Sequence, residues 1–225
     1  MRMAKTTEAL KVPAGRAGLT RDVAAERTRR DILQAATQEF AARGFGGARL
    51  DAIADQMQTT KAMVYYYFGS KEGLYRAVVE DVFAAIHRAE FEHCGDQGRD
   101  AEDELRALVT HTFAFHEAHP GYSRIVSMEN LNDARAVVQL PQVKGSPVVQ
   151  ALASILARGV AGGQFRGGID AVDLHYFISA LCVFRVSNRL TFKEIFDRDF
   201  ADPAVRARQL AMVLEGTLGL LRATA

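Results

Sequence analysis

The residues best placed to do chemistry lie in the segment 50–74, LDAIADQMQTTKAMVYYYFGSKEGL. Lys61, Ala62, Tyr65 and Tyr66 recur at helical spacing and form the outward face of a short helix over 61–67. An amine and two phenol hydroxyls on such a helix can donate hydrogen bonds to phosphates and base edges in a DNA major groove. The spacing therefore predicts a DNA-contacting helix.

Two apolar stripes flank the polar turn Gln58–Thr59–Thr60. The stripe before the turn follows the helical spacing i, i+3, i+4 and i+7, at Leu50, Ile53, Ala54 and Met57. After the turn, Val64 and Phe68 mark the inward face of the second segment. Two short amphipathic helices around a tight turn predict a helix-turn-helix.

The same segment resembles the DNA-binding signature of the TetR (tetracycline-repressor-like) transcriptional regulators. The matching features are Ile53–Ala54, the aromatic end of the short helix at Tyr65–Phe68, and the step Ser70–Leu74 into the next helix. The upstream stretch ILQAATQEFAARGF is similar to the first helix of that family, so the specific match covers about residues 27–80. The resemblance implies a DNA-binding regulator.

Two positions depart from the family pattern. Gln58 stands where the turn usually carries Gly, and Arg49 stands where Ser or Thr usually caps the first helix of the motif. A left-handed Gln costs about 1 kcal/mol relative to Gly, and a missing cap costs about as much. Neither change prevents the fold, and Arg49 offers a phosphate contact instead.

The resemblance and the exposed spacing together give eight candidate DNA-binding residues. Lys61 is expected to donate to a base edge or a phosphate, and Thr60 to cap the helix and bond a phosphate. Arg49 and Lys71 are expected to hold backbone phosphates. The full set is Arg49, Thr60, Lys61, Ala62, Met63, Tyr65, Tyr66 and Lys71.

The net charge of +1 hides an asymmetry along the chain. Residues 1–76 hold 13 Lys and Arg against 8 Asp and Glu, a net +5, whereas residues 77–225 hold 15 against 19, a net −4. The basic part contains the helix-turn-helix, as a DNA-binding protein requires.

Several protein classes are not expected from this sequence. Its 225 residues contain neither an 18-residue apolar run nor a signal-peptide core, so we expect a cytoplasmic protein without a membrane span. Cys94 and Cys182 form no disulfide framework. The sequence also lacks GxSxG, HExxH and a glycine-rich phosphate loop, which argues against catalysis, a metal site or a cofactor.

The hydrophobic pattern predicts an all-α protein. We expect a disordered basic leader over 1–20, a three-helix helix-turn-helix domain over 21–70, and a larger ligand-binding and dimerisation domain over 71–225. A connecting helix over 71–93 joins the two domains. The helices expected besides the motif and the connecting helix cover about 22–43, 102–118, 122–130, 148–159, 171–189 and 203–221.

The last two helices, 171–189 and 203–221, are apolar beyond a single stripe. Each is either a core helix within one chain or half of a four-helix bundle that forms a homodimer. The small residues Gly216 and Gly219 permit close approach of two helices. The family resemblance favours the dimer, and a two-fold dimer implies a palindromic double-stranded DNA operator.

The C-terminal half resembles, less specifically, the ligand-binding domain of one branch of these regulators, through HPGYSRIVSMENLNDAR and SNRLTFKEIF. The resemblance implies a repressor that a small organic effector releases from DNA. The candidate ligand contacts, for which plain core packing or a helix-end hydrogen bond is the alternative, are Phe113, His116, Tyr122, Met128, Glu129, Asn130, Tyr176, Phe177, Phe184 and Asn188.

Two other functions fit the sequence. The first is a helical DNA-binding dimer that binds no small molecule and is regulated by a protein partner. The second is an all-α enzyme whose catalytic groups converge only in the fold. An interior cavity with convergent polar groups would favour the effector-controlled repressor.

Overall fold

The computed structural model describes residues 14–91, 100–140 and 147–222. These residues form ten α-helices, one short 3₁₀ helix and no β-strand. One isolated bridge joins Phe165 to Arg222. The expectation of an all-α protein is confirmed.

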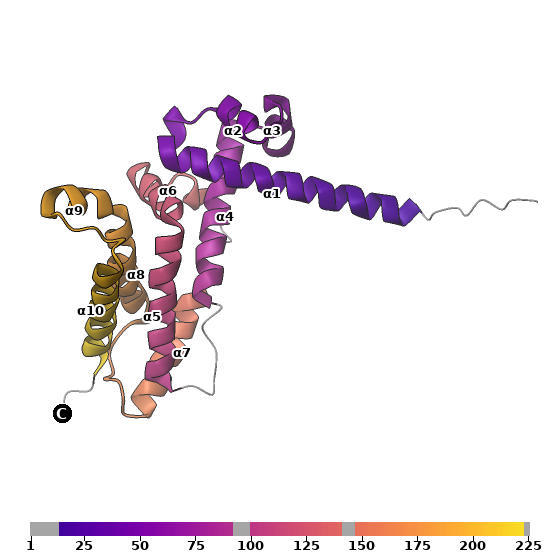
Figure 1. The fold of residues 1–225 in the computed structure, drawn as a ribbon. Coiled ribbons are helices and arrows are strands. Elements are labelled where there is room, and N and C mark those ends of the chain that lie inside the picture. The colour runs from indigo at the N-terminus through magenta and orange to yellow at the C-terminus, as the bar shows by residue number, and fades with distance from the viewer. Residues whose placement is uncertain (1–13, 92–99, 141–146, 223–225) are drawn as a thin grey trace, which may run out of the picture.

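The first three helices form the upper part of Figure 1. They are α1 (Ala14–Gly47), α2 (Leu50–Gln56) and α3 (Lys61–Phe68). A kink at Gly44, with φ of +67°, separates the last turn of α1 from the rest of that helix. The sequence predicted the end of the first helix at this glycine.

The start of α1 corrects one prediction. Residues 14–20, expected to belong to a disordered leader, are helical, and α1 begins at Ala14 directly after Pro13. No proline follows before the end of α1, and alanine and arginine favour helix, so the helix continues towards the N-terminus. Residues 1–13 of the predicted leader lie outside the described residues.

The remaining helices build the lower part of the molecule. Figure 1 shows α4, α5 and α7 as neighbouring columns, with α8 and α10 paired beside them and α9 at the upper end of that pair. Their bounds are α4 (Lys71–Phe91), α5 (Ala101–Ala118), α6 (Pro120–Leu131), η1 (Val137–Gln139), α7 (Pro147–Ala161), α8 (Ala171–Ser187), α9 (Arg189–Phe196) and α10 (Pro203–Leu221).

Side-chain caps fix three of these helix starts. The carboxylates of Asp100, Asp170 and Asp202 each accept a backbone N–H from the first turn of α5, α8 and α10, respectively. The acidic run Glu102–Glu104 lies in the first turn of α5, where the helix dipole favours negative charge.

One helix was not predicted. The helix expected over 171–189 ends at Ser187, and a separate helix, α9, follows Asn188. Asp197, in the left-handed region with φ of +48°, ends α9. The polar residues Ser187, Asn188 and Arg189 lie at this boundary, but the short helix after them was not predicted. Within the described residues, no helix is long and apolar enough to cross a membrane.

Two hydrophobic clusters hold the fold together. One joins α1, α2 and α3 to α4, and it also includes Ile125 of α6 and Leu140 after η1. The other joins α5, α7, α8 and α10 around Phe113 and Leu105. The first cluster crosses the predicted boundary at residue 70, so the helix-turn-helix shares its core with part of the C-terminal half.

Candidate nucleic-acid interface

The turn between α2 and α3 is held by backbone hydrogen bonds. The amide of Gln58 donates to the carbonyl of Asp55 over 3.1 Å, and that of Thr59 donates to the carbonyl of Ala54 over 3.0 Å. Gln58 has a φ of +52°, in the left-handed region expected from its place in the turn. The turn therefore forms without glycine, at the strain expected for a residue with a Cβ.

The two helix starts differ in their capping. The Thr60 hydroxyl accepts the backbone N–H of Met63 over 3.4 Å, so α3 is capped as predicted. Arg49 precedes α2 in an extended conformation and makes no side-chain cap. Its backbone N–H instead donates to Glu39 of α1 over 3.1 Å, which ties the start of α2 to the first helix.

The buried and exposed faces of α2 and α3 follow the predicted pattern. Leu50, Ile53 and Val64 are buried against α1 and α4. Tyr66 is 79% exposed, and Tyr65 is exposed beside it. The other exposed residues at the start of α3 are Lys61, Ala62 and Met63. The helix thus presents a continuous outer face with one ammonium group and two phenols.

Lys61 has a partner that the sequence did not reveal. Its ammonium lies 3.1 Å from the carboxylate of Asp51 on α2. Both side chains are about half exposed, so this ion pair is open to exchange with another anion. A DNA phosphate or base carbonyl would compete with Asp51 for the lysine.

The two predicted phosphate anchors differ in their surroundings. The Lys71 ammonium lies over the ring of Phe45, 5.0 Å from its centre, which restrains the side chain at the start of α4. Arg49 is exposed before α2. A third cation, Arg29 of α1, lies over the ring of Phe68 at 5.3 Å. Arg29 is not one of the eight candidate DNA-binding residues, and its approach to α3 depends on the fold.

The joint between α3 and α4 is tight. The Ser70 hydroxyl accepts the backbone N–H of Gly73 over 2.9 Å. A Cβ on Gly73 would clash with the carbonyl oxygen of Phe68, so no other residue fits there without moving the backbone. This close contact restricts the angle between α3 and α4.

A buried carboxylate ties α4 to the end of α6. One oxygen of Glu129 accepts the backbone N–H groups of Ala136 and Val137, over 3.0 and 3.3 Å. The same side chain faces Tyr75 on α4, and burial together with the Glu129 contact raises the pKa of the Tyr75 phenol. This contact lies one turn beyond the α3–α4 joint.

A second contact follows on the next residue of α4. The guanidinium of Arg76 donates to the side-chain oxygen of Gln139, in η1, over 3.0 Å. The segment between α6 and η1 is thus fastened to the start of α4 at two adjacent positions. A displacement of that segment would act on the helix that carries α3.

The predicted ligand contacts do not gather in one place. Phe113 and His116 are buried inside the C-terminal half. Asn130 and Asn188 each donate to the carbonyl four residues earlier in their own helices, over 2.9 and 3.0 Å. Met128 and Phe177 are partly buried. Tyr176 and Phe184 are exposed on the surface of α8.

Two of the predicted residues line crevices where α1 and α4 meet α6. Glu129 borders a space of about 520 Å³ together with Tyr75, Arg76 and Gln139. Tyr122 borders a larger space of about 1080 Å³ between α1, α4 and the α5–α6 corner. Both spaces lie against the helices that carry the helix-turn-helix, so an occupant would contact both halves of the chain.

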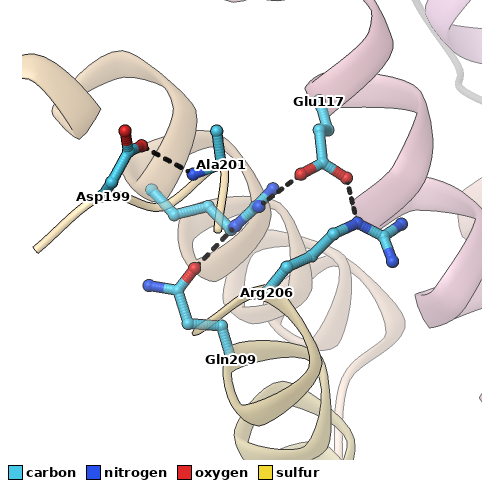
Figure 2. Close-up of polar contacts among 6 residues, drawn as sticks. Glu117, Asp199, Ala201, Arg206 and Gln209 are labelled. Atoms are coloured by element: carbon cyan, nitrogen blue, oxygen red, sulfur yellow. Dashed lines mark hydrogen bonds and ion pairs between the residues drawn. The ribbon is translucent and has the colours of Figure 1, made fainter. Parts of the chain in front are cut away.

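A charged cluster was missed by sequence reasoning (Figure 2). Glu117 of α5 accepts from Arg185 of α8 over 3.0 Å and from Arg206 of α10 over 2.5 Å. Gln209 accepts from Arg185 over 3.2 Å. The Arg185 guanidinium stacks 3.8 Å from the ring centre of Phe113. These partners are 68 and 89 residues apart in sequence, beyond the reach of any local pattern.

The charges in this cluster set the ionisation of Glu117. Burial pushes its pKa upwards, but the hydrogen bonds from Arg206 and Arg185 outweigh burial and hold the pKa below its ordinary value. The ionised carboxylate therefore joins α5 to both α8 and α10 at neutral pH.

The outer faces of α8 and α10 are apolar. Each helix buries one stripe, which on α8 includes Leu174 and Ile178. Tyr176 on the opposite side of α8 is 75% exposed, and Met212 on α10 is 70% exposed. Gly219 has no neighbour within 4 Å of an added Cβ. Exposed apolar surface of this kind on adjacent helices is typical of an association site.

Comparison with protein families finds two matches along the chain. Residues 32–78 match the family described as bacterial regulatory proteins, tetR family. Residues 102–216 match a family described as tetracyclin repressor-like, C-terminal domain. The first match contains the helix-turn-helix, and the second spans α5 to α10.

Individual proteins are similar over most of the chain. The HTH-type transcriptional repressor NicS of Pseudomonas putida is 35% identical over 201 residues, which cover 88% of this chain and 94% of that protein. A crystal structure of the putative transcriptional regulator SCO4942 from Streptomyces coelicolor has a TM-score of 0.62 and 27% identity, covering 86% of this chain and 98% of that one. A bacterial regulatory protein of the tetR family from Rhodococcus RHA1 shares the fold, with a TM-score of 0.67 at 18% identity over 88% of this chain and 98% of that one.

Proposed function

The chain belongs to the tetR family of bacterial regulatory proteins, and from this premise we propose that it represses transcription as a homodimer on a palindromic operator. We propose further that a small organic effector, bound by the C-terminal half, releases it from that operator. Family membership makes the chain a DNA-binding regulator and not an enzyme.

The geometry of α3 is the observation that carries the DNA-binding part. The helix is capped by Thr60, fixed to α4 at Gly73, and exposes Lys61, Tyr65 and Tyr66 on one face. A rigid helix with exposed donors suits base-edge contacts in the major groove. Lys71 and Arg49 at the adjoining helix starts suit the phosphates on either side.

The exposed apolar faces of α8 and α10 support the homodimer. Tyr176, Phe184 and Met212 would be buried if these two helices packed against the same helices of a second chain. A two-fold dimer carries two copies of α3, and a palindrome with half-sites about 34 Å apart matches that symmetry. Replacing Tyr176 with Glu should produce monomers in sedimentation velocity and weaken operator binding.

The crevices at Glu129 and Tyr122 support control by an effector. An occupant of either crevice would contact α4 and α6 together, and would therefore favour one arrangement of the helix that carries α3. The resulting shift is limited by the difference in effector affinity between the two arrangements. Of the ten predicted ligand contacts, Tyr122 and Glu129 are thus the strongest candidates.

The decisive experiment has two stages. Operator fragments are first selected from random DNA with the full chain, which should yield a palindrome. Calorimetry then measures the binding of metabolites to the free protein and to the operator complex. Linkage requires operator DNA to weaken the effector by the same factor by which the effector weakens DNA binding. A selected site without symmetry would contradict the dimeric mode, and equal effector affinity in both states would contradict the release mechanism.

A second function has one observation in its favour. Phe113 and His116, predicted to contact a ligand, are buried in the C-terminal half and line neither crevice. This packing suits a DNA-binding dimer that responds to a protein partner. Under that alternative, metabolites would bind neither crevice, whereas operator selection would still yield the palindrome.

A further inference from the structure

A pocket of about 420 Å³ lies between α9 and the first half of α10, away from the crevices described above. Its walls include the rings of Phe192, Phe196 and Phe200. On the α10 side it also includes Met212, which the homodimer proposed above would cover. Phe192 packs against each of the other two rings with a centre-to-centre distance of 5.1 Å. Phe196 is 61% exposed, so the aromatic wall is accessible from solution.

The charged residues that line this pocket are all basic. Arg198 and Arg208 are the charged residues that line it, and both are exposed. Within the described ranges neither arginine has an ion-pair partner. Asp199 pairs with Lys193 over 3.1 Å, and Asp202 caps α10. Asp197, which precedes Arg198 in sequence, ends α9 and does not line the pocket. The pocket therefore combines an apolar wall with uncompensated positive charge.

We propose that this pocket binds an organic anion with an aromatic or short alkyl body, such as an arylalkyl carboxylate. The three phenylalanine rings bury the apolar body. The guanidinium groups of Arg198 and Arg208 donate charge-assisted hydrogen bonds to the carboxylate, a geometry that arginine favours. A neutral compound of the same shape would gain only the apolar contact.

The pocket is connected to the charged cluster of Figure 2. Gln209 lines the pocket and also accepts the hydrogen bond from Arg185. Arg206, three residues earlier on α10, binds Glu117 of α5. A ligand that moves the start of α10 would therefore act on the contacts that join α5, α8 and α10. This site is separate from the proposed effector crevices, and its occupancy is measured without DNA.

The test compares two probes on the full chain in the absence of DNA. These are 3-(4-fluorophenyl)propionate and its uncharged amide, each observed by the line width of its fluorine NMR signal. We expect the acid to bind about tenfold more tightly than the amide, because hydrogen bonds to a charged group are the stronger ones. Equal affinities of the two probes would overturn the proposal.

Three pocket variants and one control test whether the acid binds at this pocket. Arg198→Gln and Arg208→Gln should each weaken the acid about tenfold and leave the amide unchanged. Phe196→Ala should weaken both probes by the same factor. Arg124→Gln, an exposed arginine on α6 outside the pocket, is the control for loss of one positive charge. If both pocket arginine variants behaved like Arg124→Gln, the proposal would be wrong.

The same variants test whether a second copy of the chain fills the pocket instead. Sedimentation equilibrium of Phe196→Ala and Arg208→Gln should give the dissociation constant of the unsubstituted protein. A weaker dimer combined with unchanged probe binding would assign the pocket to an interface between chains and would overturn the proposal.

Discussion

The ammonium of Lys61 and the carboxylate of Asp51 lie 3.1 Å apart at the exposed start of the helix that we propose reads DNA. The protein without DNA therefore holds its main candidate for base contact in an ion pair. Such an exposed pair contributes about 0–1 kcal/mol, so DNA can replace Asp51 at small cost.

Replacing Asp51 with Asn should tighten operator binding by about fivefold, because Lys61 becomes free and a carboxylate near the phosphates is removed. Fluorescence anisotropy with a labelled operator measures the change. Asp55→Asn removes the same charge from α2 without touching the pair, and serves as the control. Equal gains in the two variants would mean that general electrostatics, and not the release of Lys61, is responsible.

Lys71→Ala should weaken binding to operator and to random DNA by the same factor. Lys71 is expected to neutralise one phosphate, so without its ammonium the slope of log affinity against log salt should become shallower by about one unit. Titrations at several salt concentrations give this slope. A variant with an unchanged slope would show that the Lys71 ammonium stays over Phe45 in the complex.

Lys61→Ala should change the preference among DNA sequences in addition to the affinity, if Lys61 contacts a base edge. A second selection from random DNA with this variant shows whether one position of the operator becomes relaxed. An identical operator with reduced affinity would assign Lys61 to a phosphate.

Gln58→Gly should raise the free energy of unfolding by about 1 kcal/mol, since glycine adopts the left-handed conformation without strain from a Cβ. Urea denaturation followed by circular dichroism measures the change. Gln34→Gly, in the helical interior of α1, should instead lower the free energy of unfolding by about 1 kcal/mol. Loss of stability in Gln58→Gly would contradict the role assigned to the turn.

His116 should make the protein less stable as the pH falls below neutrality. Burial, followed by the nearby His119, lowers the pKa of this imidazole to about 4. The unfolded chain binds a proton near its ordinary pKa of 6.5 while the folded chain does not, so stability is lost as the pH falls from about 6.5 towards 4. At pH 5 the loss is about 2 kcal/mol.

Urea denaturation of the original chain and of His116→Gln at pH 7 and pH 5 tests this expectation. The variant should lose about 2 kcal/mol less between the two values. Glu90, whose pKa burial raises to about 7, has the opposite dependence, because acidification favours its folded, protonated form. It is present in both proteins and cancels in the comparison. Parallel losses in the two proteins would exclude His116 as the cause.

The sequence was sufficient for the DNA-binding part because its signals are local. The stripe from Leu50 to Met57, the turn at Gln58 and the cap at Thr60 are set within about a dozen residues, and each is found as predicted. The ion pair of Lys61 with Asp51 was missed, since it depends on how α2 and α3 cross. Exposure of the predicted DNA-binding residues follows from the pattern, whereas their binding to DNA stays a prediction.

The C-terminal half was less predictable because its contacts join distant segments. The resemblance named ligand contacts by residue type, but types alone do not separate an interior residue such as Phe113 from an exposed one such as Tyr176. Glu117, Arg185 and Arg206 come from three helices and share no local motif. Helix α9 was missed because its eight residues are too few to give a clear helical pattern in the sequence.

The hydrophobic cluster that joins α1–α4 to Ile125 and Leu140 has a consequence for protein engineering. A fragment cut at residue 70 would lack Leu74, Val78 and Val82, which form the floor of the helix-turn-helix. Exchanging DNA specificity between regulators by grafting that fragment would join two incompatible cores. A hybrid that keeps α1 to α6 and η1 from one parent would preserve this cluster but would divide the second one, in which α5 packs against α7, α8 and α10. Neither cut therefore separates a part of the chain that has its own complete core.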